Sequence, residues 1–282
     1  MMKYKIILML VTIFFIYIYY RKIHNYLIVM RNKIFPLYID DIKLCNNLIK
    51  EKYYNAIMRI SPRILSKEEL IYLLKYKKFM DLPTVYSLCS YNDVKQTENL
   101  LKDIIKNNIS GCLVEMGVWR GGMGMWMQAI LKYYNSKRDI WLFDTFGKFP
   151  KPIHNKDKYI NNITNFLFEN PPTLIDVKNN FKKMNLLDIN IKFVAGKFKD
   201  TILTTKINNI ALLRCDADHY DSTKMVLDYY YWKINKGGYI IIDDYNNTYM
   251  GCKEAVDEFR TKYNITNKII DTYSGSVYWK IM

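Results

Sequence analysis

Short apolar runs alternate with stretches of helical spacing from about residue 84 onward. The apolar runs have the length and content of buried strands and lie at residues 112–116, 140–143, 191–195, 210–213 and 239–242, with two shorter ones at 269–270 and 277–281. The helical stretches lie at residues 91–106, 181–187, 222–234 and 251–263, with another that ends near residue 134. Strand–helix alternation of this kind indicates an α/β fold with a doubly wound, mostly parallel, Rossmann-like sheet.

An uncharged apolar run also occupies residues 6–20, with lysine and arginine on both sides. Fifteen residues of helix reach only about 22 Å, but flanking Lys and Arg stems extend towards the membrane surface. No small-x-small cleavage site follows, and positive charge is higher downstream. We therefore predict a single-pass membrane protein with a cytosolic catalytic domain; the alternative is a buried helix of the globular domain. The predicted parts are a signal anchor (1–25), a helical linker or lid (26–83) and a catalytic domain (84–282).

The chain is strongly basic, with a formal net charge of +15. Such a charge attracts phosphate, nucleic acid or an anionic membrane face. However, lysine is spread throughout, and there is no dense basic block or Arg-rich arm, so nucleic-acid binding is not indicated. The five cysteines include no C-x-x-C pair, which argues against a structural zinc site and for a reducing compartment.

Two of the predicted strands end in acidic residues. The run 210–213 leads to Asp216 and Asp218, and the run 239–242 stops at Asp243 and Asp244. Ligands of open α/β sheets bind beyond the carboxyl ends of the strands. Because carboxylate oxygens are the ligands that Mg²⁺ prefers, the pattern predicts a divalent-metal site in an enzyme.

A glycine-rich turn follows the first strand. It contains Glu115, Gly117, Gly121 and Gly122 in the pattern E-x-G-x-x-x-G-G. Glycines let a ligand approach the backbone, and the next helix offers free N–H groups. The spacing differs from the dinucleotide and P-loop patterns, which argues against NAD(P) and ATP. Asp144, at the end of the second strand, suits a ribose diol. A turn required only for tight packing is the alternative.

Taken together, several motifs resemble the macrocin O-methyltransferase (TylF/MycF-type) family. They are VEMGVWRGG at 114–122, DTF at 144–146, LRCDAD at 213–218, YDST at 220–223, GGYIIIDDY at 237–245 and the segment 251–260. The resemblance covers roughly residues 84–282 and keeps the order of all motifs. It implies a class I S-adenosylmethionine-dependent methyltransferase that requires magnesium and methylates sugar hydroxyls of macrolides. The N-terminal anchor and residues 26–83 lie outside this pattern.

The resemblance also assigns site residues. It places Glu115, Gly117, Gly121 and Gly122 at the methionine part of the cofactor and Asp144 at its ribose. It places Gly196, Lys197 and Phe198 beside the adenine. The implied metal ligands are Asp216, Asp243 and Asp244. A metal-bound hydroxyl would be acidified and oriented for attack on the methyl group.

Other polar residues near the predicted strand ends have structural interpretations. We expect Asp218 and Asp221 to cap the following helix rather than to bind metal. Arg214, on a buried strand, is expected to pair with an internal carboxylate.

His219 departs from the family pattern, which has leucine at this position. A histidine close to the metal could take the proton from the substrate hydroxyl, so His219 joins Asp216 as a catalytic candidate. The alternative is that it points into the helix behind the site, as the leucine would.

The sequence therefore predicts a magnesium- and S-adenosylmethionine-dependent O-methyltransferase that acts on a sugar, a glycan or a glycosylated small molecule. Because the departures affect the acceptor, a lipid or nucleic-acid acceptor stays open, as does an inactive scaffold that retains the fold. The oligomeric state is also open, with a homo-oligomer among the alternatives.

Overall fold

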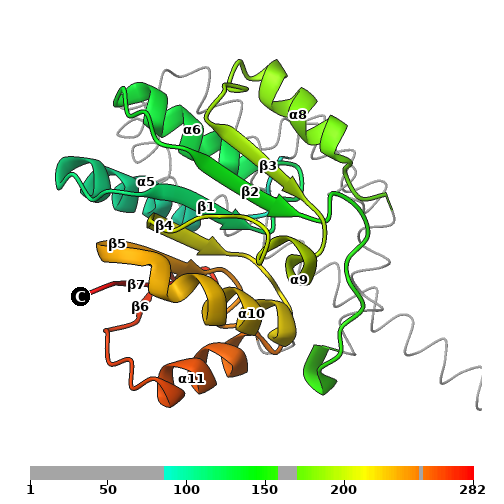
Figure 1. Ribbon diagram of the computed structural model, residues 1–282, viewed down its shortest axis with the longest axis vertical. Coiled ribbons are helices and arrows are strands. Elements are labelled where there is room, and N and C mark those ends of the chain that lie inside the picture. Colours follow the sequence, from blue (N-terminus) through cyan, green and yellow to red (C-terminus); the bar gives the residue numbers. More distant parts are fainter. Residues whose placement is uncertain (1–85, 158–169, 248–249) are drawn as a thin grey trace, which may run out of the picture. The chain divides into compact units, whose positions relative to one another are not determined.

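The computed structural model describes residues 86–157, 170–247 and 250–282. The chain forms two compact units, Met1–Leu48 and Ile49–Met282, and all described residues belong to the second (Figure 1). The predicted lid at residues 26–83 lies outside the described residues.

A seven-stranded sheet forms the centre of the described part of the chain (Figure 1). Its strands are β1 (Cys112–Met116), β2 (Ile140–Asp144), β3 (Ile191–Ala195), β4 (Ile210–Cys215), β5 (Ile234–Ile242), β6 (Ile270–Asp271) and β7 (Val277–Lys280). The strand order is β3-β2-β1-β4-β5-β7-β6. Strands β1 to β5 run parallel, and β7 is antiparallel to both neighbours. The order reverses between β1 and β4, the point at which open α/β sheets bind ligands.

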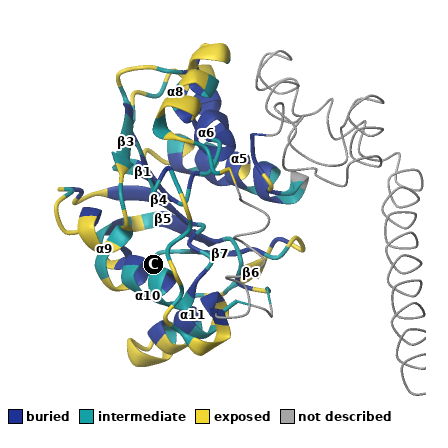
Figure 2. Ribbon diagram, turned by 90° about the vertical axis from the view of Figure 1, so that its right-hand side faces the viewer, coloured by how far each residue is buried: buried dark blue, intermediate teal, exposed yellow. Residues whose placement is uncertain are grey.

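Helices cover both faces of the sheet, as predicted (Figures 1 and 2). One face carries α5 (Tyr91–Lys106), α6 (Gly122–Tyr133) and α8 (Leu174–Lys183), and the other carries α9 (Phe198–Thr201), α10 (Tyr220–Tyr230) and α11 (Cys252–Lys262). Two short 3-10 helices, η2 (Asn155–Asp157) and η3 (Tyr231–Lys233), complete the described elements. The helix expected at 181–187 begins earlier than predicted, because Thr173 and Asp176 form a capping box that starts α8.

The two-sided cover explains the apolar runs. All six residues of β4 are buried, as is expected for a central strand that is covered on both faces. Figure 2 shows the central strands buried and the outer surfaces of α8 and α11 exposed. The core therefore lies along the sheet, while its strand ends are left for polar residues.

The prediction of a membrane protein is contradicted. Among the described residues, no helix is long and apolar enough to cross a bilayer. The longest, α5, has 16 residues and carries charged side chains, so it reaches only about 24 Å. The segment on which the prediction rested, residues 1–25, lies outside the described residues.

Candidate functional site

A cavity of about 1120 Å³ opens at the carboxyl ends of the parallel strands. Most of the sequence-predicted site residues line it, namely Glu115, Gly117, Asp144, Lys197, Phe198, Asp216, His219, Asp243 and Asp244. Gly121, Gly122 and Gly196 are not among its lining residues. The fold therefore brings the two predicted halves of the site, the glycine-rich turn and the acid-tipped strands, to one cavity.

Asp144, at the end of β2, holds the glycine-rich turn in place. Its Oδ2 accepts hydrogen bonds from the backbone N–H of Val118 (2.7 Å) and Trp119 (2.9 Å), and its Oδ1 accepts one from Phe146 (2.8 Å). Trp119 has a φ of 48°, a left-handed conformation that is uncommon outside glycine. The carboxylate thus stabilises an unusual turn at the place where a ribose was predicted.

The glycines of this turn are required by close packing. Gly117 has a φ of 98°, and a Cβ there would lie 1.9 Å from the carbonyl oxygen of Asp216. A Cβ on Gly121 would meet Phe181 at 2.8 Å, and one on Gly122 would meet the Cβ of Ser87 at 2.5 Å. Packing alone therefore accounts for Gly121 and Gly122, and their predicted contact with the cofactor remains a prediction.

Arg214 lies at the centre of the acidic half, as the sequence predicted for a buried arginine. Only 1% of its side chain is exposed. Its guanidinium donates to Asp216 Oδ2 (2.7 Å) and Asp243 Oδ1 (2.5 Å), with a longer contact to Glu115 Oε1 (3.3 Å). One positive charge therefore serves three carboxylates that come from β1 and from the turns after β4 and β5.

Glu115 is only partly compensated by this arginine. Burial raises the pKa of Glu115 to about 8, although the charge of Arg214 opposes the rise. Its Oε2 atom is buried and has no hydrogen-bond partner among the described residues. Glu115 lines the cavity, but this oxygen is not exposed to it, so the predicted contact with the cofactor remains a prediction.

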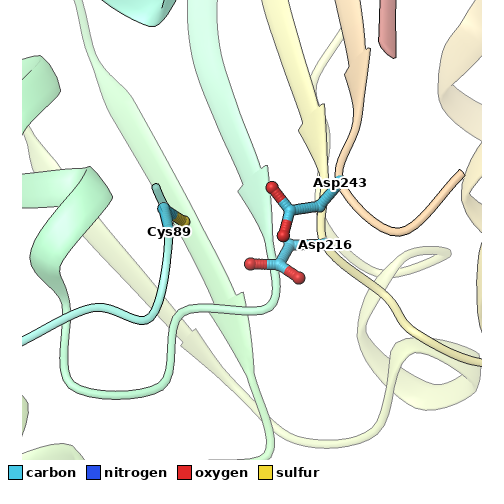
Figure 3. A group of neighbouring side chains, drawn as sticks. All are labelled: Cys89, Asp216 and Asp243. Carbon is cyan, nitrogen blue, oxygen red and sulfur yellow. The ribbon is translucent and has the colours of Figure 1, made fainter. Parts of the chain in front are cut away.

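Cys89 joins this half of the site from the segment that precedes α5. Figure 3 shows its sulfur facing the neighbouring carboxylates of Asp216 and Asp243. Arg214 Nη2 lies 2.9 Å from the sulfur, and burial raises the pKa of the thiol well above its usual value. A protonated thiol is a poor ligand for Mg²⁺, which prefers oxygen. Cys89 lines the cavity and is therefore not a suitable magnesium ligand.

A second group of neighbouring side chains contains only carboxylates as possible metal ligands. Carboxylate oxygens of Asp216, Asp218 and Asp244 all lie within 4.8 Å of one another. Burial raises the pKa of Asp218 strongly, and that of Asp244 to about 6, with further contributions from the neighbouring carboxylates. A bound cation would relieve the repulsion among these carboxylates. The chemistry of this set fits a divalent cation.

Asp218 and Asp221 do not cap α10, contrary to our expectation. The N-cap of α10 is His219, which makes no side-chain capping bond. Asp221 Oδ2 instead accepts a hydrogen bond from the backbone N–H of His154 (3.1 Å), and the first N–H of α10, from Tyr220, is bound by Asp157. Asp218, with a φ of 55°, turns the chain so that its carboxylate joins the acidic group.

His219 lines the cavity but is almost fully covered, with 2% of its surface exposed. The edge of the Phe149 ring packs against it, with ring centroids 5.8 Å apart. Burial lowers the pKa of the imidazole, although Asp157 and Asp221 oppose this effect. Its Nε2 is buried and has no hydrogen-bond partner among the described residues. The role of His219 as a base therefore remains a prediction.

Our sequence-based prediction did not include the cavity-lining residues from the segment before α5 and from the loop before β7. Residues 87–90 and Ser274 line the cavity. The carboxylate of Asp93 connects the two segments by hydrogen bonds. It accepts from Ser90 Oγ (2.7 Å) and from the hydroxyls of Ser274 and Ser276. Burial tends to raise the pKa of Asp93, but these hydrogen bonds lower it. The capping box of Ser90 and Asp93 is visible in the sequence, whereas its serine partners are about 180 residues away.

Comparison with known proteins agrees with this geometry. Residues 26–281 match the sequence profile of the macrocin O-methyltransferase (TylF) family. Demethyldecarbamoylnovobiocin O-methyltransferase of Streptomyces niveus is 38% identical over 195 residues, which are 66% of this chain and 73% of that protein. Mycinamicin III 3''-O-methyltransferase of Micromonospora griseorubida is 34% identical over 206 residues, 71% and 80% of the two chains. The structure of the O-methyltransferase NovP matches with a TM-score of 0.66 and 34% identity, over 70% of this chain and 83% of that one.

These matches confirm one expectation and correct another. The structural match shows the class I methyltransferase fold that the motifs implied. The profile match begins at residue 26, so residues 26–83, which we had placed outside the family pattern, fall within it.

Proposed function

This chain belongs to the macrocin O-methyltransferase family and is an S-adenosylmethionine-dependent O-methyltransferase, and we propose that it methylates a sugar hydroxyl of a glycosylated small molecule with the help of a divalent cation. The relatives named above are, by their names, O-methyltransferases of demethyldecarbamoylnovobiocin and of mycinamicin III. The observation that supports the cation is the group of three neighbouring carboxylates in the same cavity as the glycine-rich turn.

When bound, S-adenosylmethionine supplies an electrophilic methyl group, and a divalent cation supplies positive charge that lowers the pKa of a hydroxyl. Glu115 and the turn at Gly117 would hold the methionine end of the cofactor. Asp144 would fix the turn and accept from the ribose, with Lys197 and Phe198 beside the adenine. The acceptor hydroxyl would then be bound between this half of the cavity and the acidic half.

The acidic half would hold the cation. The motif resemblance names Asp216, Asp243 and Asp244 as ligands, and the geometry adds Asp218, which lies within reach of Asp216 and Asp244. Arg214 binds both Asp216 Oδ2 (2.7 Å) and Asp243 Oδ1 (2.5 Å). The oxygens of Asp216 also lie within 4.8 Å of those of Asp218 and Asp244, whereas Asp243 is grouped with Asp216 and Cys89. We therefore assign Asp216, Asp218 and Asp244 as the principal ligands, with Asp243 held beside them by Arg214.

His219 is the proposed proton acceptor. Its low pKa leaves the imidazole neutral at physiological pH, which is the form that can take a proton. Movement of Phe149 on binding of the acceptor would uncover it.

The test is transfer of a labelled methyl group from S-adenosylmethionine to demethyldecarbamoylnovobiocin and to mycinamicin III, with Mg²⁺ or with EDTA. We expect transfer to at least one of them, its loss in EDTA and its recovery with added Mg²⁺. Asp244→Asn should lower the rate by about 10³-fold or more, while S-adenosylhomocysteine binding measured by calorimetry stays within a few-fold. Asp228→Asn, an exposed change on α10, is the matched control.

Each part of the proposal has its own contrary result. Undiminished transfer in EDTA would refute the cation. Methylation of neither compound, by a protein that does bind S-adenosylhomocysteine, would refute this acceptor class. If His219→Leu leaves turnover unchanged at saturating cofactor, His219 is not the base.

A further inference from the structure

Asp157 is a fully buried carboxylate that the sequence did not single out. It ends η2, is 0% exposed, and forms no salt bridge with a cationic side chain of the described residues. A buried carboxylate of this kind is costly unless it accepts hydrogen bonds. Its Oδ2 accepts from the backbone N–H of Tyr220 and its Oδ1 from that of Gly251, each at 2.7 Å.

These two N–H groups belong to the starts of two different helices. Tyr220 is the first residue of α10, and Gly251 is the N-cap of α11. Helix N-termini carry partial positive charge and unpaired N–H groups, and both favour a carboxylate. One side chain therefore bridges two helix starts, and their partial charges compensate the charge of Asp157.

The two helix starts are held very close together at this point. A Cβ at Gly251 would lie 2.6 Å from the Cβ of Tyr220 and 3.3 Å from both carboxylate oxygens of Asp157. No other residue type fits position 251 unless α10 and α11 move apart. The contact between the helix starts is therefore tight and specific.

Further contacts fix the segment that carries Asp157. The His154 ring stacks on the Tyr220 ring, with centroids 4.1 Å apart and planes at 17°. The Lys156 Nζ lies 2.5 Å from Glu254 Oε2 on α11. This segment is thus attached to both helices by side chains other than that of Asp157.

The proposed cation ligands lie on the two turns that lead into these helices. Asp216 and Asp218 come between β4 and α10, and Asp244 comes between β5 and α11. The distance between the helix starts therefore helps to set the distance between Asp218 and Asp244.

We propose that Asp157 is a positioning residue for the cation site: by joining the starts of α10 and α11 it keeps Asp216, Asp218 and Asp244 at the spacing that binds one divalent cation. This inference rests on the proposed function. A carboxylate suits the role because it accepts from two N–H groups at once. Asparagine would place an NH₂ group against one of them.

The experiment is direct titration with Mn²⁺, followed by the electron paramagnetic resonance signal of free Mn²⁺, which needs no acceptor. Asp157→Asn should weaken Mn²⁺ binding about tenfold, as is typical of residues that orient metal ligands, while S-adenosylhomocysteine binding stays within about twofold. Asp176→Asn is the matched control, because Asp176 also binds a helix-start backbone N–H, that of Thr173 at 2.9 Å, but at α8. It should leave both affinities unchanged.

A second variant separates spacing from charge. Gly251→Ala keeps the charge of Asp157 but forces the helix starts apart, so it too should weaken Mn²⁺ binding several-fold. If Asp157→Asn weakens binding and Gly251→Ala does not, Asp157 acts only through its negative charge and the inference is overturned. Unchanged Mn²⁺ binding in Asp157→Asn, or an equal loss of S-adenosylhomocysteine binding, also overturns it. A wild-type protein that binds no Mn²⁺ would refute the cation of the proposed function together with this inference.

Discussion

The carboxylates in the two halves of the cavity differ in the partners that compensate them. At the β1–β2 end, Asp144 accepts from three backbone N–H groups. At the β4–β5 end, carboxylate oxygens of Asp216, Asp218 and Asp244 lie within 4.8 Å of one another. One arginine, Arg214, pairs with two carboxylates there and with Glu115 of β1. Asp144 is thus hydrogen-bonded within the protein, whereas Glu115 and the acidic half together contain more carboxylates than one arginine compensates.

This difference indicates which part of the cavity favours a positively charged ligand. A carboxylate that is fully hydrogen-bonded stabilises the backbone around it, whereas crowded carboxylates raise one another's pKa and favour the binding of a positive group. Asp144 therefore holds the turn in shape, and the crowded acidic half favours a positively charged ligand. Three variants test this comparison, from the largest expected effect to the smallest.

Replacing Arg214 should have the largest effect. Arg214→Met leaves Glu115, Asp216 and Asp243 without their shared positive charge, and removal of one partner from a buried ionic group costs about 3–5 kcal/mol. Urea unfolding at neutral pH measures it. Lys132→Met breaks the exposed pair with Asp188 (2.9 Å) and should cost less than about 1 kcal/mol. Equal losses in the two variants would show that Arg214 does not compensate a charged cluster.

The next effect is a change in pH dependence. The pKa of Glu115 is raised to about 8 in the folded protein, so its protonated form is favoured by folding. The stability that it contributes is present below its ordinary pKa and is lost as pH rises towards 8. Glu115→Gln should remove this loss, which has a slope of at most ~1.4 kcal/mol per pH unit. Unfolding free energies at several pH values between about 5 and 8 measure it, and parallel curves for wild type and variant would contradict the prediction.

The smallest effect should come from replacing Asp144, which accepts from three backbone N–H groups. Asp144→Asn keeps one accepting oxygen but sets an NH₂ group against backbone N–H groups, which should cost about 1–2 kcal/mol. Binding of S-adenosylhomocysteine should weaken with it, since the turn loses its support, and calorimetry measures this. Asp200→Asn, an exposed change near the end of the next strand, is the control. A loss as large as that of Arg214→Met would remove the distinction between the two halves.

Much of this site could be predicted because its residues stand next to strong local patterns. Asp144, Asp216 and Asp244 follow apolar strands directly, and strands of a parallel sheet end at one edge. The pairing of Arg214 was predicted for the same reason: a charged residue inside a buried strand requires a partner.

The role of Asp218 was predicted wrongly because it depends on position in space. Capping is the common role of aspartate before a helix, but here Asp157, more than 60 residues earlier in the chain, already binds the first N–H of α10. Local preference therefore gave way to a long-range contact that no spacing in the sequence reveals.

The sequence by itself determined the doubly wound fold, the order of the strands along the chain and the residues that stand at their ends, because hydrophobic periodicity and turn chemistry are local properties. Only the tertiary structure decided which of those residues meet. It brought Cys89 to Arg214, Asp93 to the serines of the last loop, and Asp157 to two helix starts. These contacts join segments far apart in sequence, and the side chains involved take their roles from the neighbours that folding places around them.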